Sequence, residues 1–415
     1  MGKKLAYKWV IAAACFILCI VGLGLCSGNK ALFLVATSEA LGISRSAYAV
    51  SYSLRYISTA VVNIFFGNLL MKFGTRKLIG AGLVILVASC VADAVAETVV
   101  GLYIAGILLG VGLTFAGTTV IGCVIRQWFP DHQGAVLGVV LSANALGAAV
   151  TAPWFSAMIY GNDVFGYRKV YWIVAGILVV SGIVLMLLFK EPTKRDGEPR
   201  ENERKPAKTR RWEGLSYEEE KKKPYFYIIW ACLFLTGVLL LSTAGVSAAH
   251  MKDRGVPPEF IALVTSVYAL MLAASKFLIG TLCDKKGLQT ATLTCNAAAL
   301  GMTVLLCVVS GSGWGKLLAM TYAVFAGLAL PLQTVLLPLM ASDMFCERDY
   351  GKALGMFIAA SNAGSVTGTM LSNLCFDRWG TYLYVFIADA VLIVAISVAF
   401  VVSYRKMMAP RNSKV

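Results

Sequence analysis

Long apolar runs alternate with short polar segments along the whole 415-residue chain. A run of about 20 apolar residues can cross a bilayer as a helix, because an α-helix rises about 1.5 Å per residue. The pattern predicts twelve such segments, near residues 9–36, 46–71, 77–97, 100–126, 133–160, 168–189, 225–251, 259–282, 288–310, 316–343, 350–374 and 381–405. The chain is therefore expected to be an all-α membrane protein with 12 transmembrane helices.

One polar segment is much longer than the others and divides the twelve runs into two sets of six. Residues 190–224 read "KEPTKRDGEPRENERKPAKTRRWEGLSYEEEKKKP", a mixed-charge sequence that suits a solvated linker. A short amphipathic helix is expected near Arg211–Glu220. The predicted domains are an N-terminal six-helix bundle over 1–189, a cytoplasmic linker over 190–224 and a C-terminal six-helix bundle over 225–415.

The two halves repeat each other in sequence. "GNLLMKFG" at 67–74 matches "GTLCDKKG" at 280–287, and "GAVLGVVLSANALG" at 134–147 matches "GKALGMFIAASNAG" at 351–364. Parallel repeats of six helices are typical of transporters in which two bundles rock about a central site.

Composition and charge placement agree with this interpretation. The chain is 58% hydrophobic and 14% charged, whereas soluble domains carry about a quarter charged residues. The net charge of +15 does not indicate nucleic-acid binding, because the lysines and arginines lie between apolar runs, where they set membrane orientation. If the N-terminus is inside, the cytoplasmic segments hold 27 of the 37 lysines and arginines, and the outer loops hold seven. A multi-pass protein of the plasma or inner membrane is expected, with both termini cytoplasmic.

Few residues are suited to metal or covalent chemistry. The eleven cysteines form no CxxC pair, most lie in apolar runs, and the chain has two histidines. No disulfide framework, metal site or cofactor is predicted. No nucleophile and base pair is apparent, so an enzyme is not expected.

Three cations interrupt the apolar runs: Lys30, Arg55 and Lys276. A charge at mid-bilayer costs about 2.5–3.5 kcal/mol on insertion scales, so each needs a compensating partner. Lys30 and Lys276 could instead extend to the membrane surface, and Arg55 could form a structural ion pair. Carboxylates such as Asp93 lie near segment ends, so the cations are expected to outnumber their partners. This pattern favours a binding site for an anion.

Tyr268 shares a helix face with Lys276 and could donate to the same anion, although interior packing explains it equally well.

The "GTLCDKKG" element resembles the loop motif of the major facilitator superfamily, in which a glycine, an aspartate, a basic residue and a glycine recur in order. The second-half copy keeps Gly280, Asp284, Lys285 and Gly287, and Asp284 with Lys285 could bond to a neighbouring helix end. The first-half copy keeps Gly67, Lys72, Gly74 and Arg76 but has Met71 in place of the aspartate. The resemblance implies that these residues control the conformational change.

Within that superfamily the chain resembles the monocarboxylate porter and oxalate/formate antiporter branch over nearly all twelve segments. "GNKALFLVATSEALGISRSAYAVSYSL" carries Lys30, and "SKFLIG" puts Lys276 where the branch usually has an arginine. The chain differs at two places from the residues that couple transport to a proton or to a counter-anion in this branch. Leu272 stands where proton-coupled members have an aspartate, and residues 362–373 hold no cation.

The predicted function is a secondary transporter that moves small organic anions, either mono- or dicarboxylates, by alternating access. Lys30, Arg55, Lys276 and Tyr268 are the expected substrate ligands, and a proton or a counter-anion is the expected second solute. Two alternatives stay open: efflux of hydrophobic or cationic compounds, and, less favoured, a transporter-like sensor.

Overall fold

A computed structural model of the chain describes residues 2–130, 132–159, 165–189 and 215–409. The described part is helical apart from short connections and one isolated bridge between Leu215 and Phe345. The first part of the chain forms α1 (Gly2–Cys19), the π-helix η1 (Ile20–Gly28), α2 (Lys30–Leu41), α3 (Arg45–Val95), α4 (Val99–Ala116), α5 (Thr118–Trp128), α6 (Gln133–Ile159) and α7 (Gly166–Leu188). The remainder forms α8 (Tyr217–Glu220), α9 (Pro224–Ala244), α10 (Ser247–Asp253), α11 (Pro258–Lys286), α12 (Leu288–Val308), α13 (Gly313–Ala329), α14 (Pro331–Thr334), α15 (Leu336–Met344), α16 (Tyr350–Trp379) and α17 (Leu383–Met407).

Each predicted apolar segment has a helical counterpart. Among the described residues, ten helical stretches are long and apolar enough to cross a membrane. One of them runs along α3, whose 51 residues would extend roughly 77 Å if straight, more than twice the hydrocarbon thickness. α3 therefore supplies two spans, and the 30-residue α16 supplies the segment predicted near 350–374. The expectation of an all-α, multi-pass membrane protein is confirmed.

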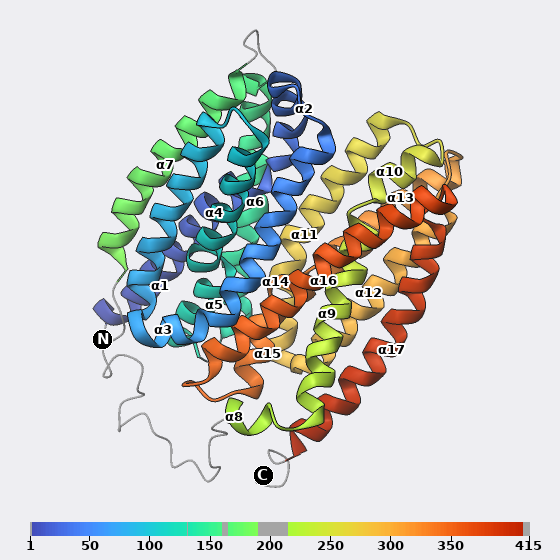
Figure 1. Cartoon of the computed structure of the whole chain (residues 1–415). Coiled ribbons are helices and arrows are strands. Elements are labelled where there is room, and N and C mark those ends of the chain that lie inside the picture. Colours follow the sequence, from blue (N-terminus) through green and yellow to red (C-terminus); the bar gives the residue numbers. More distant parts are fainter. Residues whose placement is uncertain (1, 131, 160–164, 190–214, 410–415) are drawn as a thin grey trace. The chain divides into compact units, whose positions relative to one another are not determined.

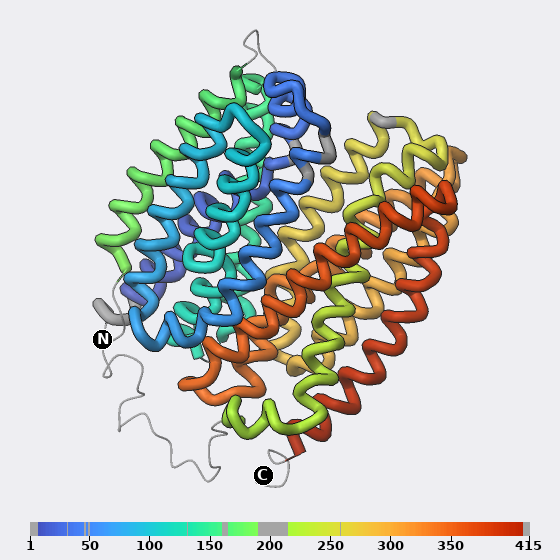
Figure 2. Tube along the Cα trace, in the orientation of Figure 1, coloured from blue at the N-terminus to red at the C-terminus, as the bar shows by residue number. Residues whose placement is uncertain are grey.

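The two arms of α3 meet at Gly74, where the backbone leaves the helical region with φ 76° and ψ 166°. Figure 2 traces α3 as two arms joined by a turn. Gly287, the matching position of the second half, has nearly the same conformation, with φ 84° and ψ 165°. Gly42 and Gly255 form another matched pair with positive φ, at 61° and 77°. Only glycine adopts such angles without strain, so the sequence repeat is also a repeat of backbone turns.

The chain divides into two compact units. The first comprises residues 1–125 and 136–191, and the second comprises residues 126–135 and 192–415. The connection between α5 and α6 thus belongs to the second unit. Residues 190–214, which make up most of the predicted linker, lie outside the described part of the chain.

In the first unit, α3 packs along α4 (Figure 1). Two glycines of α4 lie at this crossing. A Cβ on Gly106 would lie 2.2 Å from the carbonyl oxygen of Ser51, and a Cβ on Gly110 would lie 2.3 Å from that of Arg55. Small residues at such crossings let the helix backbones approach closely, which is how membrane helices gain packing energy. This contact fixes the part of α3 that carries Arg55.

In the second unit, α9 packs against both α16 and α17 (Figure 1). Where α9 crosses α16, the two helix backbones lie so close that no side chain fits between them. A Cβ on Gly364 would lie 1.9 Å from the oxygen of Phe234, and one on Gly237 would lie 2.1 Å from the oxygen of Ser361. A buried carboxylate adds to the contact between α9 and α17, because Asp389 accepts hydrogen bonds from Ser242 and Thr243.

Replacing Gly364 with alanine is expected to destabilise the protein markedly, because the added methyl group meets backbone that cannot move aside. Overpacking of this kind costs about 1–3 kcal/mol or more. Gly176 in α7 is the matched control, since a Cβ there meets nothing within 4 Å. Thermal unfolding in detergent should show a lower midpoint for Gly364→Ala and an unchanged or higher midpoint for Gly176→Ala. Equal midpoints for the two variants would contradict the packing account.

The end of the linker docks onto the connection between α15 and α16. The Leu215 backbone N–H donates to the Met344 oxygen at 2.8 Å, and the Tyr217 N–H donates to the Asp349 carboxylate at 2.9 Å. The Tyr217 ring lies 6.1 Å from that of Phe345. The short helix expected near Arg211–Glu220 is present in its described part as α8.

Candidate functional site

The first membrane-crossing segment opens into the π-helix η1 before Lys30. Its glycines let it approach α6: a Cβ on Gly24 would lie 3.2 Å from the Asn144 oxygen, and one on Gly28 would lie 2.7 Å from the Ala148 Cβ. Asn29 then donates to the side-chain oxygen of Thr151 at 2.8 Å. Wide π-turns often occur at functional sites, and this one fixes the position from which the next side chain extends.

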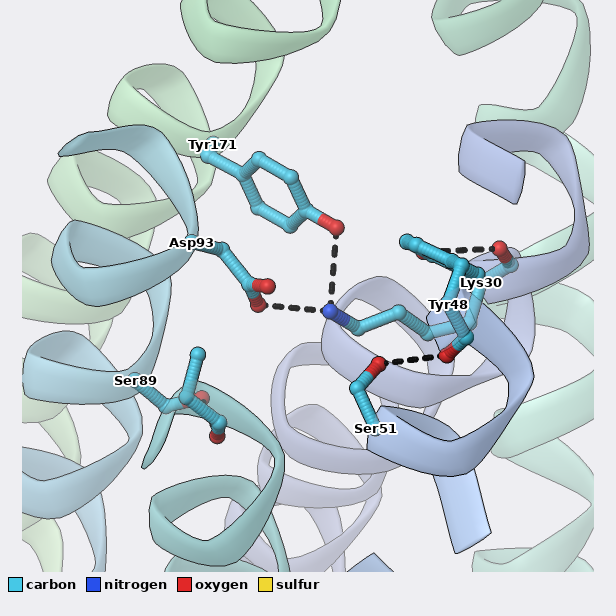
Figure 3. Close-up of polar contacts among 7 residues, drawn as sticks. Lys30, Tyr48, Ser51, Ser89, Asp93 and Tyr171 are labelled. Carbon is cyan, nitrogen blue, oxygen red and sulfur yellow. Dashed lines mark hydrogen bonds and ion pairs between the residues drawn. The ribbon is translucent and has the colours of Figure 1, made fainter. Parts of the chain in front are cut away.

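Lys30 lies in a buried polar cluster with residues from two other helices. Its Nζ is 2.5 Å from the Asp93 Oδ2 and 2.9 Å from the Tyr171 hydroxyl oxygen. Figure 3 shows Asp93 on α3 and Tyr171 on α7 pointing toward this ammonium group. The Lys30 and Asp93 side chains are only 10% and 5% exposed. The Tyr48 hydroxyl donates to the Lys30 carbonyl oxygen at 3.3 Å, which holds the segment from the first arm of α3.

Lys30 therefore has a carboxylate partner, whereas the sequence pattern predicts only that the cations outnumber their partners. Asp93 lies near the end of its predicted segment, and Lys30 also lies away from the middle of its own segment. Both residues belong to the outer part of the predicted spans, so matching their depths could have identified the pair. Their separation of 63 positions in the chain gives no local signal for it.

Arg55 is the second cation of the first unit, and aromatic rings surround it. The side chain is 9% exposed, and its Nη1 donates to the Ser27 hydroxyl oxygen. The guanidinium carbon lies 4.6 Å from the Tyr52 ring centroid and 4.0 Å from the Tyr56 ring centroid. No carboxylate of the described residues lies within salt-bridge distance of it. Arg55 is thus a buried cation that rings and a hydroxyl group stabilise, without an opposite charge.

Three tyrosines place Arg55 and Lys30 along one strip of the first unit. Tyr48, Tyr52 and Tyr56 recur every four residues on α3, so they share a helix face. Tyr48 contacts the Lys30 backbone, and the Tyr52 and Tyr56 rings contact the Arg55 guanidinium group. We call the set formed by Ser27, Lys30, Tyr48, Tyr52, Arg55, Tyr56, Asp93 and Tyr171 the polar strip. Of this set, the apolar-run pattern singles out only the two cations as candidate ligands, because tyrosines are common packing residues in membrane helices.

Lys276 lies in the second unit on α11 and is buried, with 2% of its surface exposed. The neighbouring Ser275 hydroxyl donates to the Gly327 oxygen of α13 at 2.5 Å. A Cβ on Gly327 would lie 2.9 Å from the backbone nitrogen of Leu272, so α11 and α13 are in close contact beside the lysine. Tyr268, one turn before Leu272, is half-buried and lies near Tyr322 of α13. Extension of the Lys276 ammonium to the solvent, one of the two interpretations, does not fit this burial.

The second-half copy of the loop motif, residues 280–287, makes a defined contact in the second unit. The Asp284 carboxylate accepts hydrogen bonds from the backbone N–H groups of Gly134 and Ala135, at 2.9 Å and 2.8 Å. These N–H groups begin α6, and a carboxylate at a helix N-terminus is favoured by the helix dipole. Gly280 allows the approach, because a Cβ there would lie 2.1 Å from the Gly134 oxygen. Lys285 is exposed and Gly287 forms the turn that ends α11.

The first-half copy of the motif has no equivalent carboxylate contact. Gly67 is buried in α3, and Gly74 forms the turn between its arms. Arg76 donates to the Met186 oxygen at 2.9 Å, and the Lys72 Nζ lies 5.4 Å from the Phe73 ring centroid. Met71 stands at the position that matches Asp284, and a thioether side chain cannot accept hydrogen bonds as a carboxylate does.

Replacing Asp284 with asparagine is expected to slow transport while leaving substrate affinity nearly unchanged. The amide can accept one of the two hydrogen bonds but carries no charge, so the contact with the α6 N-terminus weakens by about 1–2 kcal/mol. A loss of that size corresponds to roughly tenfold in rate if the contact stabilises one transport state. Uptake kinetics in proteoliposomes measure this, and Asp377→Asn, an exposed acid at the end of α16, is the control. A raised Km with unchanged maximal rate would contradict the expectation.

Comparison with known proteins identifies the family. The Major Facilitator Superfamily model matches residues 15–249 and 229–414. The chain is 26% identical over 408 residues to YcxA of Bacillus subtilis (strain 168), an uncharacterized MFS-type transporter, covering 95% of this chain and 92% of that protein. It is 22% identical to the human monocarboxylate transporter 2, covering 92% and 82% of the two chains. It is 21% identical to the oxalate:formate antiporter of Oxalobacter formigenes, covering 84% and 80%.

The solved structures agree on the fold. The E. coli fucose:proton symporter FucP superposes with a TM-score of 0.69 at 15% identity, covering 96% of this chain and 99% of that one. Similar proteins also include a multidrug resistance protein of Bacillus subtilis and a human chromaffin granule amine transporter, so family membership does not by itself select the solute. The resemblance to the monocarboxylate and oxalate/formate branch, inferred from sequence motifs, is confirmed. The chain belongs to the Major Facilitator Superfamily and is a membrane transporter, not an enzyme.

Proposed function

We propose that the protein is a secondary transporter of small organic anions, carboxylates above all. The observation that carries this proposal is Arg55, a buried cation with no carboxylate partner among the described residues. A buried charge without a counter-charge is costly, so a site that keeps one gains by binding an anion. The planar guanidinium group also matches a carboxylate, since it can donate two parallel hydrogen bonds.

The aromatic rings beside Arg55 suit a carboxylate that carries an apolar chain. Tyr52 and Tyr56 stabilise the cation through their ring faces when the site is empty, and both rings are half-buried. Their hydroxyl groups can donate to an anion, and their rings can pack on carbon atoms. The site is thus suited to small organic acids more than to inorganic anions, which offer no apolar surface.

The second unit would supply Lys276 and Tyr268. Lys276 is buried on α11, and Tyr268 is on the same helix face two turns away. In the proposed mechanism the two bundles alternate access to the substrate, and anion binding neutralises positive charge before the site closes. Both termini would lie in the cytoplasm, in the plasma or inner membrane, because the lysines and arginines are concentrated on that side.

Lys276→Ala is expected to abolish carboxylate uptake by purified protein in proteoliposomes, while the variant keeps its unfolding midpoint within a few degrees. Removal of a charged ligand group costs about 2–5 kcal/mol of binding. Lys252→Ala, an exposed lysine of the same unit, is the matched control. Wild-type uptake by Lys276→Ala would remove this residue from the proposed site.

A ligand screen separates the proposal from efflux of hydrophobic or cationic compounds. The purified protein is heated with members of a panel of small carboxylates and with cationic dyes, and the unfolding midpoint is measured. A ligand at 100 times its Kd stabilises by about 2.7 kcal/mol, which is an easily measured shift. Stabilisation by carboxylates supports the proposal. Stabilisation by the dyes alone, unaffected by carboxylates, would favour efflux of cationic compounds. Binding of a solute without its transport in proteoliposomes would favour a sensor.

A further inference from the structure

Asp389 is a buried carboxylate of the second unit that has no part in the anion site proposed above. It lies in the second turn of α17, and only 4% of the residue is exposed. The helix around it, Leu383–Met407, is long and apolar enough to cross a membrane. No cation of the described residues lies within salt-bridge distance of Asp389. A carboxylate that stays ionised in such a place is costly.

Two hydroxyl groups of α9 bond to one oxygen of this carboxylate. The Ser242 Oγ lies 2.5 Å from the Asp389 Oδ2, and the Thr243 Oγ1 lies 2.9 Å from the same atom. Both residues are buried. The backbone oxygen of Ser242 in turn accepts from the Ser372 hydroxyl group of α16 at 3.1 Å. The carboxylate therefore lies where three helices of the second unit, α9, α16 and α17, are joined by polar groups.

The Ser242 hydroxyl group has one proton and two acceptors within reach. Besides the Asp389 Oδ2, the Leu239 backbone oxygen lies 3.0 Å from the Ser242 Oγ. A hydroxyl group donates once, so it can donate to only one of these two oxygens at a time. When Asp389 is ionised, Ser242 donates to it. When Asp389 carries a proton, the carboxyl O–H donates to the Ser242 Oγ, and Ser242 donates to Leu239 instead.

Both charge states of Asp389 thus keep their hydrogen bonds without movement of a heavy atom. A helical serine commonly bonds to the carbonyl group three residues earlier, and here that bond gives the Ser242 proton a second position. Two opposing effects act on the carboxyl group. Burial in an apolar helix bundle favours the neutral form, and the two hydroxyl donors favour the ionised form.

We propose that Asp389 is a proton-binding site that makes the packing of α9 against α17 depend on pH. Release of the proton puts a charge between the two helices, which the hydroxyl groups of Ser242 and Thr243 stabilise. Uptake of the proton removes the charge and turns the Ser242 hydroxyl group to the α9 backbone. The inference goes beyond the proposed function and does not depend on it, because the site lies outside the residues assigned to anion binding.

Among the described residues facing this part of α17, His250 of α10 is the neighbour that titrates near neutral pH. Its ring lies 4.9 Å from that of Phe386, one turn before Asp389. Thiols and phenols ordinarily keep their protons at neutral pH, and those nearby are Cys232 of α9, Cys307 of α12, Cys375 of α16 and Tyr382 at the start of α17. The charged side chains at the ends of α10 and α16 are exposed, namely Asp253, Arg254, Asp377 and Arg378. A measurement specific for carboxyl groups is therefore required.

Infrared spectroscopy of the purified full-length protein provides that measurement, because a protonated carboxyl group has a C=O stretching band that a carboxylate lacks. Choline replaces sodium in the buffer, so that the proton is the small cation on offer. The wild type should show a carboxyl band that is lost reversibly between about pH 5 and about pH 9, a range in which exposed acids are already ionised. Asp389→Asn should lack this band, and Asp377→Asn, an exposed acid of the same unit, should keep it. Persistence of the titrating band in Asp389→Asn, or its absence from the wild type, would overturn the proposal.

Unfolding midpoints give a second test without any solute, so its result is independent of whether the protein transports carboxylates. Asparagine cannot ionise and resembles the protonated state in charge. The wild-type midpoint should therefore fall relative to that of Asp389→Asn as the pH rises, because the wild type alone then buries the charge. The contribution of His250 is common to both proteins and cancels. A difference that stays constant with pH would mean a purely structural carboxyl group and would overturn the proposal.

Ser242→Ala provides the decisive variant if Asp389→Asn does not fold. It removes a donor that the ionised state needs, so the carboxyl band should persist to higher pH than in the wild type. Ser266→Ala, an exposed serine of α11 that also bonds to its own helix backbone, is the matched control and should leave the band unchanged. An unchanged titration of the band in Ser242→Ala would contradict the role of the hydroxyl group and overturn the proposal.

Discussion

Arg55→Gln is expected to abolish carboxylate uptake and to weaken carboxylate binding by roughly 100-fold or more. Loss of one partner from a buried, hydrogen-bonded charge pair costs about 2–5 kcal/mol, and each 1.4 kcal/mol is a factor of ten in affinity. Glutamine keeps a donor near Ser27 but supplies neither the positive charge nor the second parallel N–H group. The effect should appear in both the dissociation constant and the uptake rate, because the same contact is needed to bind and to close the site.

Two further variants test the geometry of this site. Arg55→Lys keeps the charge and loses the planar fork, so it should bind carboxylates more weakly than the wild type but better than Arg55→Gln. Arg378→Gln removes an exposed arginine at the end of α16 and is the matched control. Since no opposite charge is left behind when Arg55 is removed, Arg55→Gln should unfold at or above the wild-type midpoint in the absence of ligand. Normal carboxylate binding by Arg55→Gln would refute its assignment as the anchor.

Lys30→Met is expected to be the most destabilising single change in the polar strip, by about 3–5 kcal/mol. Removing one partner of a buried ion pair leaves the other charge uncompensated, and that cost exceeds the net value of the intact pair. Asp93 would keep the charge while being only 5% exposed. Thermal or denaturant unfolding in detergent measures the change.

A double-mutant cycle distinguishes this mechanism from simple loss of packing. Asp93→Asn alone should cost less, because the amide oxygen still accepts from Lys30 and the Tyr171 hydroxyl group remains at 2.9 Å. Lys30→Met/Asp93→Asn has no unpaired charge and should be more stable than Lys30→Met. If the free-energy changes of the two single variants summed to that of the double variant, the two residues would not be coupled, and the ion pair would not contribute to stability.

Much of the architecture could be predicted because membrane-spanning helices obey a strong local rule. In lipid each backbone N–H and C=O group must be satisfied within its own helix, so an apolar run of sufficient length is enough to predict a span. The long apolar run broken by "GTRK" predicted two helices, and the structure has one continuous element turned at Gly74. The turn glycines could also be predicted from the sequence, since Gly74 and Gly287 occupy matching positions of the sequence repeat.

The site could be predicted only in part. Arg55 and Lys276 stand out because a charge inside an apolar run is costly, and both are buried in the structure. Tyr52 and Tyr56 gave no such signal, since aromatic residues are common in membrane helices and their contact with Arg55 depends on side-chain direction. The sequence predicted that Asp284 bonds to the end of a neighbouring helix. It could not predict which helix, because the first N–H groups of α6 lie about 150 positions away in the chain.

The sequence by itself determined the membrane class, the helix count, the internal repeat and the presence of three buried cations, because each of these follows from local composition and the cost of charge in lipid. The tertiary structure decided which cations have a counter-charge. Helix packing brings Asp93 to Lys30 and brings only rings and a hydroxyl group to Arg55. Pairing depends on which helices are neighbours and at what depth, and that is a property of the packed bundle. The difference between these two cations, which the chain does not reveal locally, carries the proposed anion site.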